Sequence, residues 1–249
     1  MLLKKRFIMA IIKVEGIEDI KYLDEMVNKG SFGEIYPFSD DTYFKKLNRS
    51  QGSLGLLDNQ IRLEILTDLM NLKGSKYLIL PKDIYVTEKC LLGYTSLIKK
   101  AKSIRDMSLD SDYGDVIKAF KLLCKDIALL ADKNIFDCDF NQNNILFDGK
   151  MYLLDFDQSI YVENDNHLYK RMVYELFQSL YLSLVKDGFG SRVLMEKDLE
   201  GLIQTFKSYT STNYDLFFEL LRWKLEFYTR MKINTVGDFR KSLSLTKKG

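Results

Sequence analysis

Short runs that either alternate between apolar and polar residues or are apolar throughout dominate the first hundred residues of the chain. A period of two is typical of strands that bury one face, so this part of the chain is predicted to form a sheet. The predicted strands are residues 33–38, 42–47, 77–80 and 90–96. Between the second and third of these, residues 58–72 place apolar side chains such as Ile65 and Leu69 at helical spacing. We therefore expect one helix to interrupt the sheet.

Helical periodicity replaces this alternation in the second half of the chain. One apolar stripe runs from Val116 to Leu130, and another runs from Val173 to Leu184. Residues 197–209 and 214–232 have the pattern of further amphipathic helices. The second half is therefore predicted to be mainly helical.

A hairpin pattern lies within this helical half. Two short apolar runs, residues 145–147 and 151–154, flank the sequence Asp-Gly-Lys, which suits a tight reversal. Because a hairpin brings its two outer ends together, we expect Asn144 and Asp155 to lie side by side. Amide and carboxylate oxygens are ligands that Mg²⁺ accepts together with water and phosphate. Asp139, five residues before Asn144, is placed to orient an attacking hydroxyl group.

The composition of the chain argues against several kinds of catalytic site and of binding partner. The 249 residues carry a formal net charge of +2, which gives no reason to expect nucleic acid or an acidic membrane as partner. His167 is the single histidine, so Ser-His-Asp, Cys-His and histidine-rich metal sites are disfavoured. Three cysteines without a C-x-x-C pair favour a reducing compartment. The apolar run at residues 7–12 is too short for a signal peptide or a membrane span, so we expect a soluble cytoplasmic protein.

The stretch from Asp139 to Phe156 resembles the protein-kinase superfamily, in which an Asp-x-x-x-x-Asn loop precedes a hairpin that ends in Asp-Phe-Gly. The resemblance implies that Asp139 is the catalytic aspartate and that Asn144 and Asp155 bind Mg²⁺. Residues 27–36, VNKGSFGEIY, similarly resemble the glycine-rich loop that covers the phosphates of ATP. In this loop Asn28 replaces the first glycine. The expected nucleotide contacts there are Asn28, Gly30, Ser31, Phe32, Gly33 and Ile35.

The strand predicted at residues 42–47 resembles the kinase strand that presents a phosphate-binding lysine. Alternation puts Lys45 and Lys46 on opposite faces, and the spacing from Gly33 favours Lys45. In the family this lysine pairs with a glutamate of the following helix, and Glu64 is the only glutamate in residues 59–72. The apolar register equally allows Arg62 to point inward, with Glu64 left on the surface.

The order of these motifs implies an α+β, bilobal protein-kinase-like fold. Residues 1–95 are expected to form a nucleotide-binding lobe, a small antiparallel sheet with one helix. Residues 96–249 are expected to form a larger, mainly helical catalytic lobe. The resemblance places the adenine contacts near the connection, on the backbone of Ser96, Leu97 and Ile98.

Several residues depart from the family pattern. Asp137 and Cys138 stand where protein kinases have His and Arg, and Asn141 replaces a lysine. The missing arginine argues against control by a phosphorylated activation loop. Asp157 occupies the glycine position of the acidic turn, where it either stiffens the turn or adds a metal ligand. No Ala-Pro-Glu sequence follows.

The expected function is ATP-dependent transfer of phosphate to a hydroxyl acceptor, with ATP and Mg²⁺ as cofactors. A divergent Ser/Thr protein kinase is favoured. The alternatives are a small-molecule kinase of the aminoglycoside or choline type, which differs in its acceptor, and a pseudokinase scaffold that binds nucleotide without turnover. A helical protein with coincidental motifs is the remaining interpretation, and it would show no stabilisation by ATP.

Overall fold

The computed structural model describes residues 10–21, 25–29, 33–47, 56–137, 139–163, 165–185 and 213–245. The helix predicted at residues 197–209 lies outside these ranges. The fold is mixed α+β, and the chain divides into two compact units. Unit 1 comprises Met1–Lys73, Ile79–Lys99 and Phe156–Ile160, and unit 2 comprises Gly74–Leu78, Lys100–Asp155 and Tyr161–Gly249. The boundary expected after residue 95 remains a prediction.

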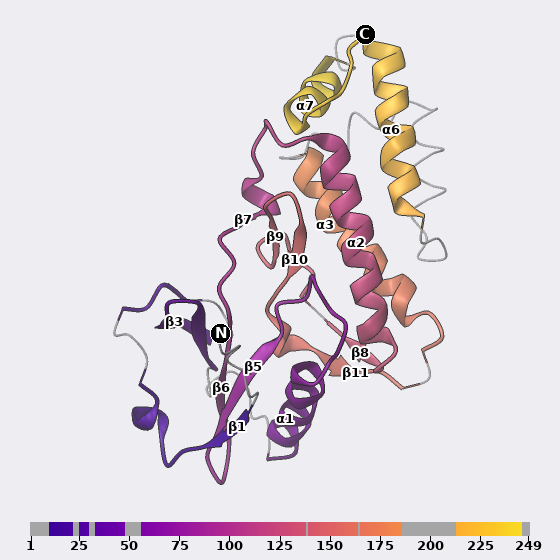
Figure 1. Cartoon of the computed structure of the whole chain (residues 1–249). Coiled ribbons are helices and arrows are strands. Elements are labelled where there is room, and N and C mark those ends of the chain that lie inside the picture. Colours follow the sequence, from indigo (N-terminus) through magenta and orange to yellow (C-terminus); the bar gives the residue numbers. More distant parts are fainter. Residues whose placement is uncertain are drawn as a thin grey trace, which may run out of the picture. The chain divides into compact units, whose positions relative to one another are not determined.

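Unit 1 is a six-stranded sheet with one α-helix among its described residues (Figure 1). Its strands are β1 (Ala10–Lys13), β2 (Asn28–Lys29), β3 (Gly33–Ser39), β4 (Thr42–Leu47), β5 (Pro81–Val86) and β6 (Leu91–Leu97). The spatial order is β1-β5-β6-β4-β3-β2, and β1 runs parallel to β5 while the other neighbours are antiparallel. The sheet is therefore mixed rather than purely antiparallel. The helix is α1 (Leu56–Met70), and the short 3₁₀ turns are η1 (Ile17–Asp19) and η3 (Phe156–Gln158).

Strand β4 has a buried residue on each face of the sheet. On one face Phe44 packs edge-on against Tyr85, with ring centroids 5.4 Å apart, in a cluster with Ile20 and Leu92. Lys45, the next residue, is buried on the opposite face. The strands predicted at residues 33–38, 42–47 and 90–96 are confirmed to within one residue at each end.

Helix α1 contacts β5 and β6 and buries Ile65, Leu66 and Leu69. These residues lie at the i, i+1 and i+4 positions that one helix face requires. The same register leaves Glu64 exposed and Arg62 half-buried.

The strand predicted at residues 77–80 is wrong. Lys76 N and Tyr77 N both donate hydrogen bonds of 2.6 Å to Asp126 Oδ2, and Ser75 Oγ donates to the same oxygen over 3.1 Å. Only Leu78 forms an isolated bridge. The amides of Lys76 and Tyr77 are thus bound by a carboxylate of α2 instead of by a neighbouring strand.

Unit 2 is built on four described helices (Figure 1). They are α2 (Tyr113–Ala131), α3 (Leu168–Val185), α6 (Tyr214–Thr229) and α7 (Val236–Leu245). Both predicted apolar stripes are confirmed, since the stripe residues of α2 and α3 are buried. None of the helices in the described ranges is long and apolar enough to cross a bilayer.

Unit 2 also contains short strands. They are β7 (Lys102–Ser103), β8 (Ile135–Phe136), β9 (Ile145–Phe147) and β10 (Met151–Leu153), with a 3₁₀ turn η2 (Ile104–Asp106). Strand β11 (Ile160–Tyr161) spans the point at which the chain passes from unit 1 to unit 2. One sheet has the order β10-β9-β7, and β8 pairs with β11. The predicted hairpin is confirmed, since β9 and β10 are antiparallel with Leu153 opposite Ile145. Gly149 at its tip has φ 93°, a conformation that favours glycine.

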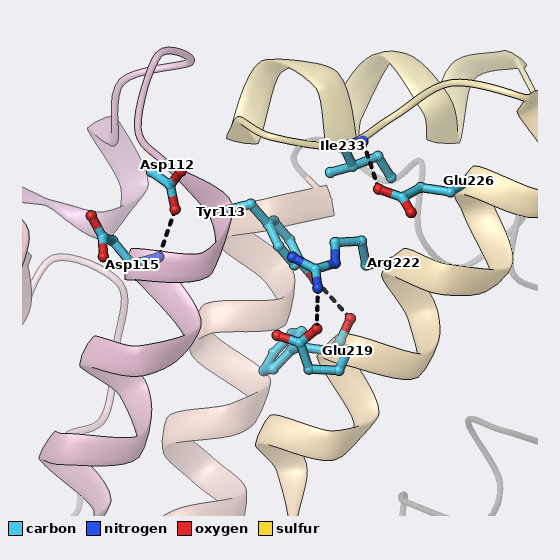
Figure 2. Close-up of polar contacts among 8 residues, drawn as sticks. Asp112, Tyr113, Asp115, Glu219, Arg222, Glu226 and Ile233 are labelled. Atoms are coloured by element: carbon cyan, nitrogen blue, oxygen red, sulfur yellow. Dashed lines mark hydrogen bonds and ion pairs between the residues drawn. The ribbon is translucent and has the colours of Figure 1, made fainter.

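Side-chain contacts cap the start of α2 and join it to the middle of α6 (Figure 2). Asp112 caps α2 by accepting a 2.8 Å bond from Asp115 N. Tyr113 at the start of α2 donates to the carbonyl of Phe218 in α6 over 3.0 Å, and its burial raises the pKa of the phenol well above the usual value. Arg222 of α6 pairs with Glu219, and its guanidinium lies 5.9 Å from the Tyr113 ring centroid. These contacts hold α6 against α2.

Candidate functional site

A polar loop between β8 and β9 orients Asp139. Asn141 Nδ2 donates a 2.6 Å hydrogen bond to Asp139 Oδ1, and Asn144 Nδ2 donates a 2.7 Å bond to Asp139 Oδ2. Asp139 N in turn donates to Oδ1 of the buried Asp137 over 3.2 Å. A carboxylate oxygen has two lone pairs, so each oxygen of Asp139 can accept a further hydrogen bond. The loop therefore presents a half-buried carboxylate in one fixed orientation.

Asn144 joins this loop to the hairpin. Its amide N, together with that of Asn143, donates to Asn141 Oδ1. Its carbonyl accepts a 3.0 Å hydrogen bond from Leu154 N, which continues the β9–β10 ladder by one residue. Asp155 therefore directly follows the residue that pairs with Asn144. Because Asn144 Nδ2 faces Asp139, Oδ1 is the atom of this side chain that can ligate a cation.

Asp155 has an unusual backbone conformation, with φ 76°. L residues rarely adopt the left-handed region, although aspartate and asparagine tolerate it better than most. A residue stays there only when its surroundings fix it. The chain enters η3 at the next residue, and Phe156 is buried. The backbone is thus constrained at the residue predicted to bind a metal.

A buried ion pair forms in unit 1. Lys45 Nζ lies 3.1 Å from Asp157 Oδ2, and the two side chains are only 5% and 2% exposed. The two lysines of β4 point to opposite sides, as alternation predicts, because Lys46 instead pairs with Glu34 at 3.2 Å. Lys45 is thus the lysine that reaches the α1 side of the sheet with a carboxylate partner.

Gly33 allows the backbone to approach Lys45 closely. A Cβ atom at this position would lie 2.6 Å from the carbonyl oxygen of Lys46 and 3.1 Å from the Cε atom of Lys45. The first of these contacts is with backbone, so a side chain at position 33 would force β3 and β4 apart. Gly33, the first residue of β3 and a glycine of the predicted phosphate-binding loop, therefore cannot be replaced without moving the backbone.

Glu34, the next residue, is the centre of a charged cluster on the other face. It accepts a 2.8 Å bond from the Tyr36 hydroxyl and pairs with Lys46 at 3.2 Å and Lys29 at 3.3 Å. The Tyr36 hydrogen bond, followed by those of the two lysines, lowers the pKa of Glu34 from 4.5 to about 2. The cluster connects β2, β3 and β4.

This cluster predicts a pH dependence of stability. A carboxyl group whose folded pKa is depressed stabilises the fold above its unfolded pKa and loses this effect as the pH falls toward its folded pKa. Wild type is therefore expected to be more stable than Glu34→Gln at pH 6, with the difference shrinking between pH 4.5 and about 2. Urea denaturation of both proteins across this range measures it. A difference that stays constant with pH contradicts the prediction.

Glu64 is not the partner of Lys45, which corrects the expected pair. It is exposed and accepts a 3.2 Å hydrogen bond from Gln60, one turn earlier on α1. The reason is helical register, since burying Ile65 and Leu66 turns Glu64 outward. Arg62 is half-buried and lines a narrow recess with Asp157, which matches the alternative register that the sequence allowed.

The other expected nucleotide contacts fall into two groups. Asn28 is exposed on β2 and Ile35 is half-buried on β3, whereas Gly30, Ser31 and Phe32 lie outside the described residues. Of the expected adenine contacts, Ser96 is fully buried and Leu97 is exposed, and Ile98 N donates a 2.8 Å bond to Asp41 O. The Ile98 amide is therefore already bonded within the protein, and adenine binding at these residues stays a prediction.

The expected Mg²⁺ ligands form a small set. In the described ranges, no three or more His, Cys, Asp or Glu side chains gather in a way that could hold a metal. Asn144 and Asp155 supply one amide oxygen and one carboxylate. Mg²⁺ is commonly held by one or two protein carboxylates and completed by water and substrate phosphates, so this donor set fits a magnesium ion that arrives with a nucleotide.

Two residues have contacts that the sequence did not reveal. Asn141, noted only as the replacement of a lysine, is the donor that orients Asp139 Oδ1. Asp157, assigned either a stiffening or a metal-binding role, is the ion-pair partner of Lys45. Cys138, between Asp137 and Asp139, lies outside the described residues. The one signal in the sequence for the Lys45–Asp157 ion pair was that Asp157, a charged residue, stands where the kinase family has a glycine.

Comparison with known proteins adds no assignment. No family model matches the chain, and a search among curated proteins finds no match.

Proposed function

We propose that the chain is an ATP-dependent phosphotransferase with a protein-kinase-like, bilobal arrangement, which moves the γ-phosphate of Mg·ATP to a hydroxyl acceptor. The observation that carries this proposal is the orientation of Asp139 by Asn141 and Asn144, on a loop that leads through a confirmed hairpin to the constrained Asp155. Phosphoryl transfer depends mainly on positioning and charge stabilisation, and these are the features that a rigid polar loop supplies.

Each residue has a defined part in the proposed reaction. Asp139 accepts a hydrogen bond from the acceptor hydroxyl and receives its proton as the oxygen attacks the γ-phosphorus, while the bond from the γ-phosphorus to the bridging oxygen breaks and ADP leaves. Asn144 Oδ1 and Asp155 hold Mg²⁺, which when bound neutralises charge on the phosphate oxygens. Lys45 binds phosphate oxygens through its ammonium group. The favoured acceptor is a serine or threonine hydroxyl of a protein, and a small-molecule hydroxyl is the alternative.

The proposal is tested by replacing Asp155 with asparagine, which keeps the size of the side chain but removes its charge. We expect Mg·ATP affinity, measured by calorimetry, to fall about tenfold or more, because one charged ligand of the ion is lost. Asp148→Asn, at the exposed tip of the same hairpin, is the matched control and is expected to bind like wild type.

Transfer is measured with labelled ATP, Mg²⁺ and a panel of peptides and hydroxylated small molecules, which also identifies the acceptor class. Binding without transfer to any acceptor, or to water, assigns the chain to nucleotide-binding scaffolds. Absence of Mg·ATP binding by wild type, or equal binding by Asp155→Asn and wild type, rejects the proposal.

A further inference from the structure

The ion pair of Lys45 joins two elements that are far apart in the sequence. Lys45 lies on β4, and Asp157 lies in η3, 112 residues later by their residue numbers. Both residues belong to unit 1, and their charged atoms are 3.1 Å apart with almost no exposure to solvent. Water screens such a pair little, so the position of one charge constrains the other strongly.

The Asp157 carboxylate also lies two residues after Asp155, the predicted metal ligand. Only Phe156 separates Asp157 from Asp155, so the two aspartate Cα atoms are at most about 7 Å apart by covalent geometry alone. Phe156 is buried, and Asp155 is held in the left-handed region. One short, constrained turn therefore carries both the predicted metal ligand and the carboxylate that holds the lysine.

We propose that Asp157, rather than a glutamate of α1, is the residue that positions Lys45 for phosphate binding. This inference rests on the proposed function and adds how its site is regulated. The acidic turn at residues 155–157 places the lysine. Because Glu64 does not pair with Lys45, a movement of α1 would not free the lysine by breaking such a pair. An ammonium group has three N–H donors, so an ion pair with Asp157 is compatible with hydrogen bonds to phosphate oxygens.

Two other roles for Asp157 give different results. If Asp157 were a metal ligand, its loss would weaken nucleotide binding only when Mg²⁺ is present. If the ion pair were purely structural, its loss would lower stability and leave nucleotide binding by the folded protein unchanged. As the positioning residue, Asp157 affects the lysine–phosphate contact whether or not Mg²⁺ is present.

The experiment measures the affinity of the full chain for ATP by calorimetry, with Mg²⁺ and with EDTA. Asp157→Asn is expected to weaken binding about tenfold to a hundredfold in both conditions, which is the range for losing a well-placed charged hydrogen bond. Glu64→Gln, the matched control on α1, is expected to bind like wild type. Asp155→Asn is expected to lose affinity mainly in the presence of Mg²⁺.

Several outcomes overturn the inference. They are wild-type affinity of folded Asp157→Asn, a loss confined to the Mg²⁺ condition, or a tenfold loss in Glu64→Gln. The last outcome remains decisive if Asp157→Asn does not fold. Failure of the proposed function is a separate result, because wild type itself would then bind no ATP.

Discussion

Replacing Asp139 with alanine is expected to slow phosphoryl transfer by about a hundredfold to ten-thousandfold, the range for losing a general base. Mg·ATP affinity should change little, because Asp139 is assigned to the acceptor hydroxyl rather than to the nucleotide. The residue is half-buried and held by two amide donors, so the effect comes from losing an oriented carboxylate. Single-turnover transfer of labelled phosphate measures the rate, and calorimetry measures the affinity.

The matched controls separate chemistry from folding. Asp148→Ala makes the same substitution at the exposed hairpin tip and should retain wild-type transfer. Asn141→Ala removes one of the donors to Asp139, so a smaller loss of rate is expected, with affinity again preserved. Transfer by Asp139→Ala at the wild-type rate contradicts its assignment as the acceptor of the hydroxyl proton.

Local signals predicted those parts of the fold in which neighbouring residues decide the structure. The hairpin at residues 145–153 is such a case, since Asp-Gly between two apolar runs fixes both the turn and the register. The opposite orientations of Lys45 and Lys46 likewise follow from strand alternation alone. The orientation of Asp139 was not predicted, although the donors Asn141 and Asn144 lie no more than five positions away.

Contacts between distant residues could not be predicted in the same way. The sequence contains several carboxylates that could reach Lys45, and family resemblance pointed to Glu64. Glu64 points outward because Ile65 and Leu66 fill the interface between α1 and the sheet. This register depends on packing between segments that are distant in the sequence. Asp157 then provides the charge at the position where the family has a glycine.

The error at residues 77–80 has a similar physical cause. The run Tyr-Leu-Ile-Leu has the composition of a buried strand, and composition does not tell which partner satisfies its amides. Asp126, about fifty positions away on α2, takes the amides of Lys76 and Tyr77, and β5 begins only at Pro81. The amide of Tyr77, the first residue of the predicted strand, is thus bonded to a helix carboxylate and not to a neighbouring strand.

Removing either charge of the Lys45–Asp157 pair alone is expected to lower the free energy of unfolding by about 3–5 kcal/mol, because the other charge stays buried without its partner. Replacing both, as Lys45→Met with Asp157→Leu, is expected to restore most of this loss, since apolar side chains of similar size need no counter-charge in a dry site. The exposed fractions of 5% and 2% make this one of the least screened ion pairs of the described residues.

The measurement must report on unit 1, to which both residues belong. Trp223, the single tryptophan, lies on α6 of unit 2, so its fluorescence would follow the wrong part of the chain. Amide hydrogen exchange of β4 and β6 reads the local opening free energy directly in wild type, the two single variants and the double variant. The non-additivity of the single losses gives the coupling of the pair. Additive losses, with the double variant the least stable of the four, contradict the expectation that each buried charge stabilises the other.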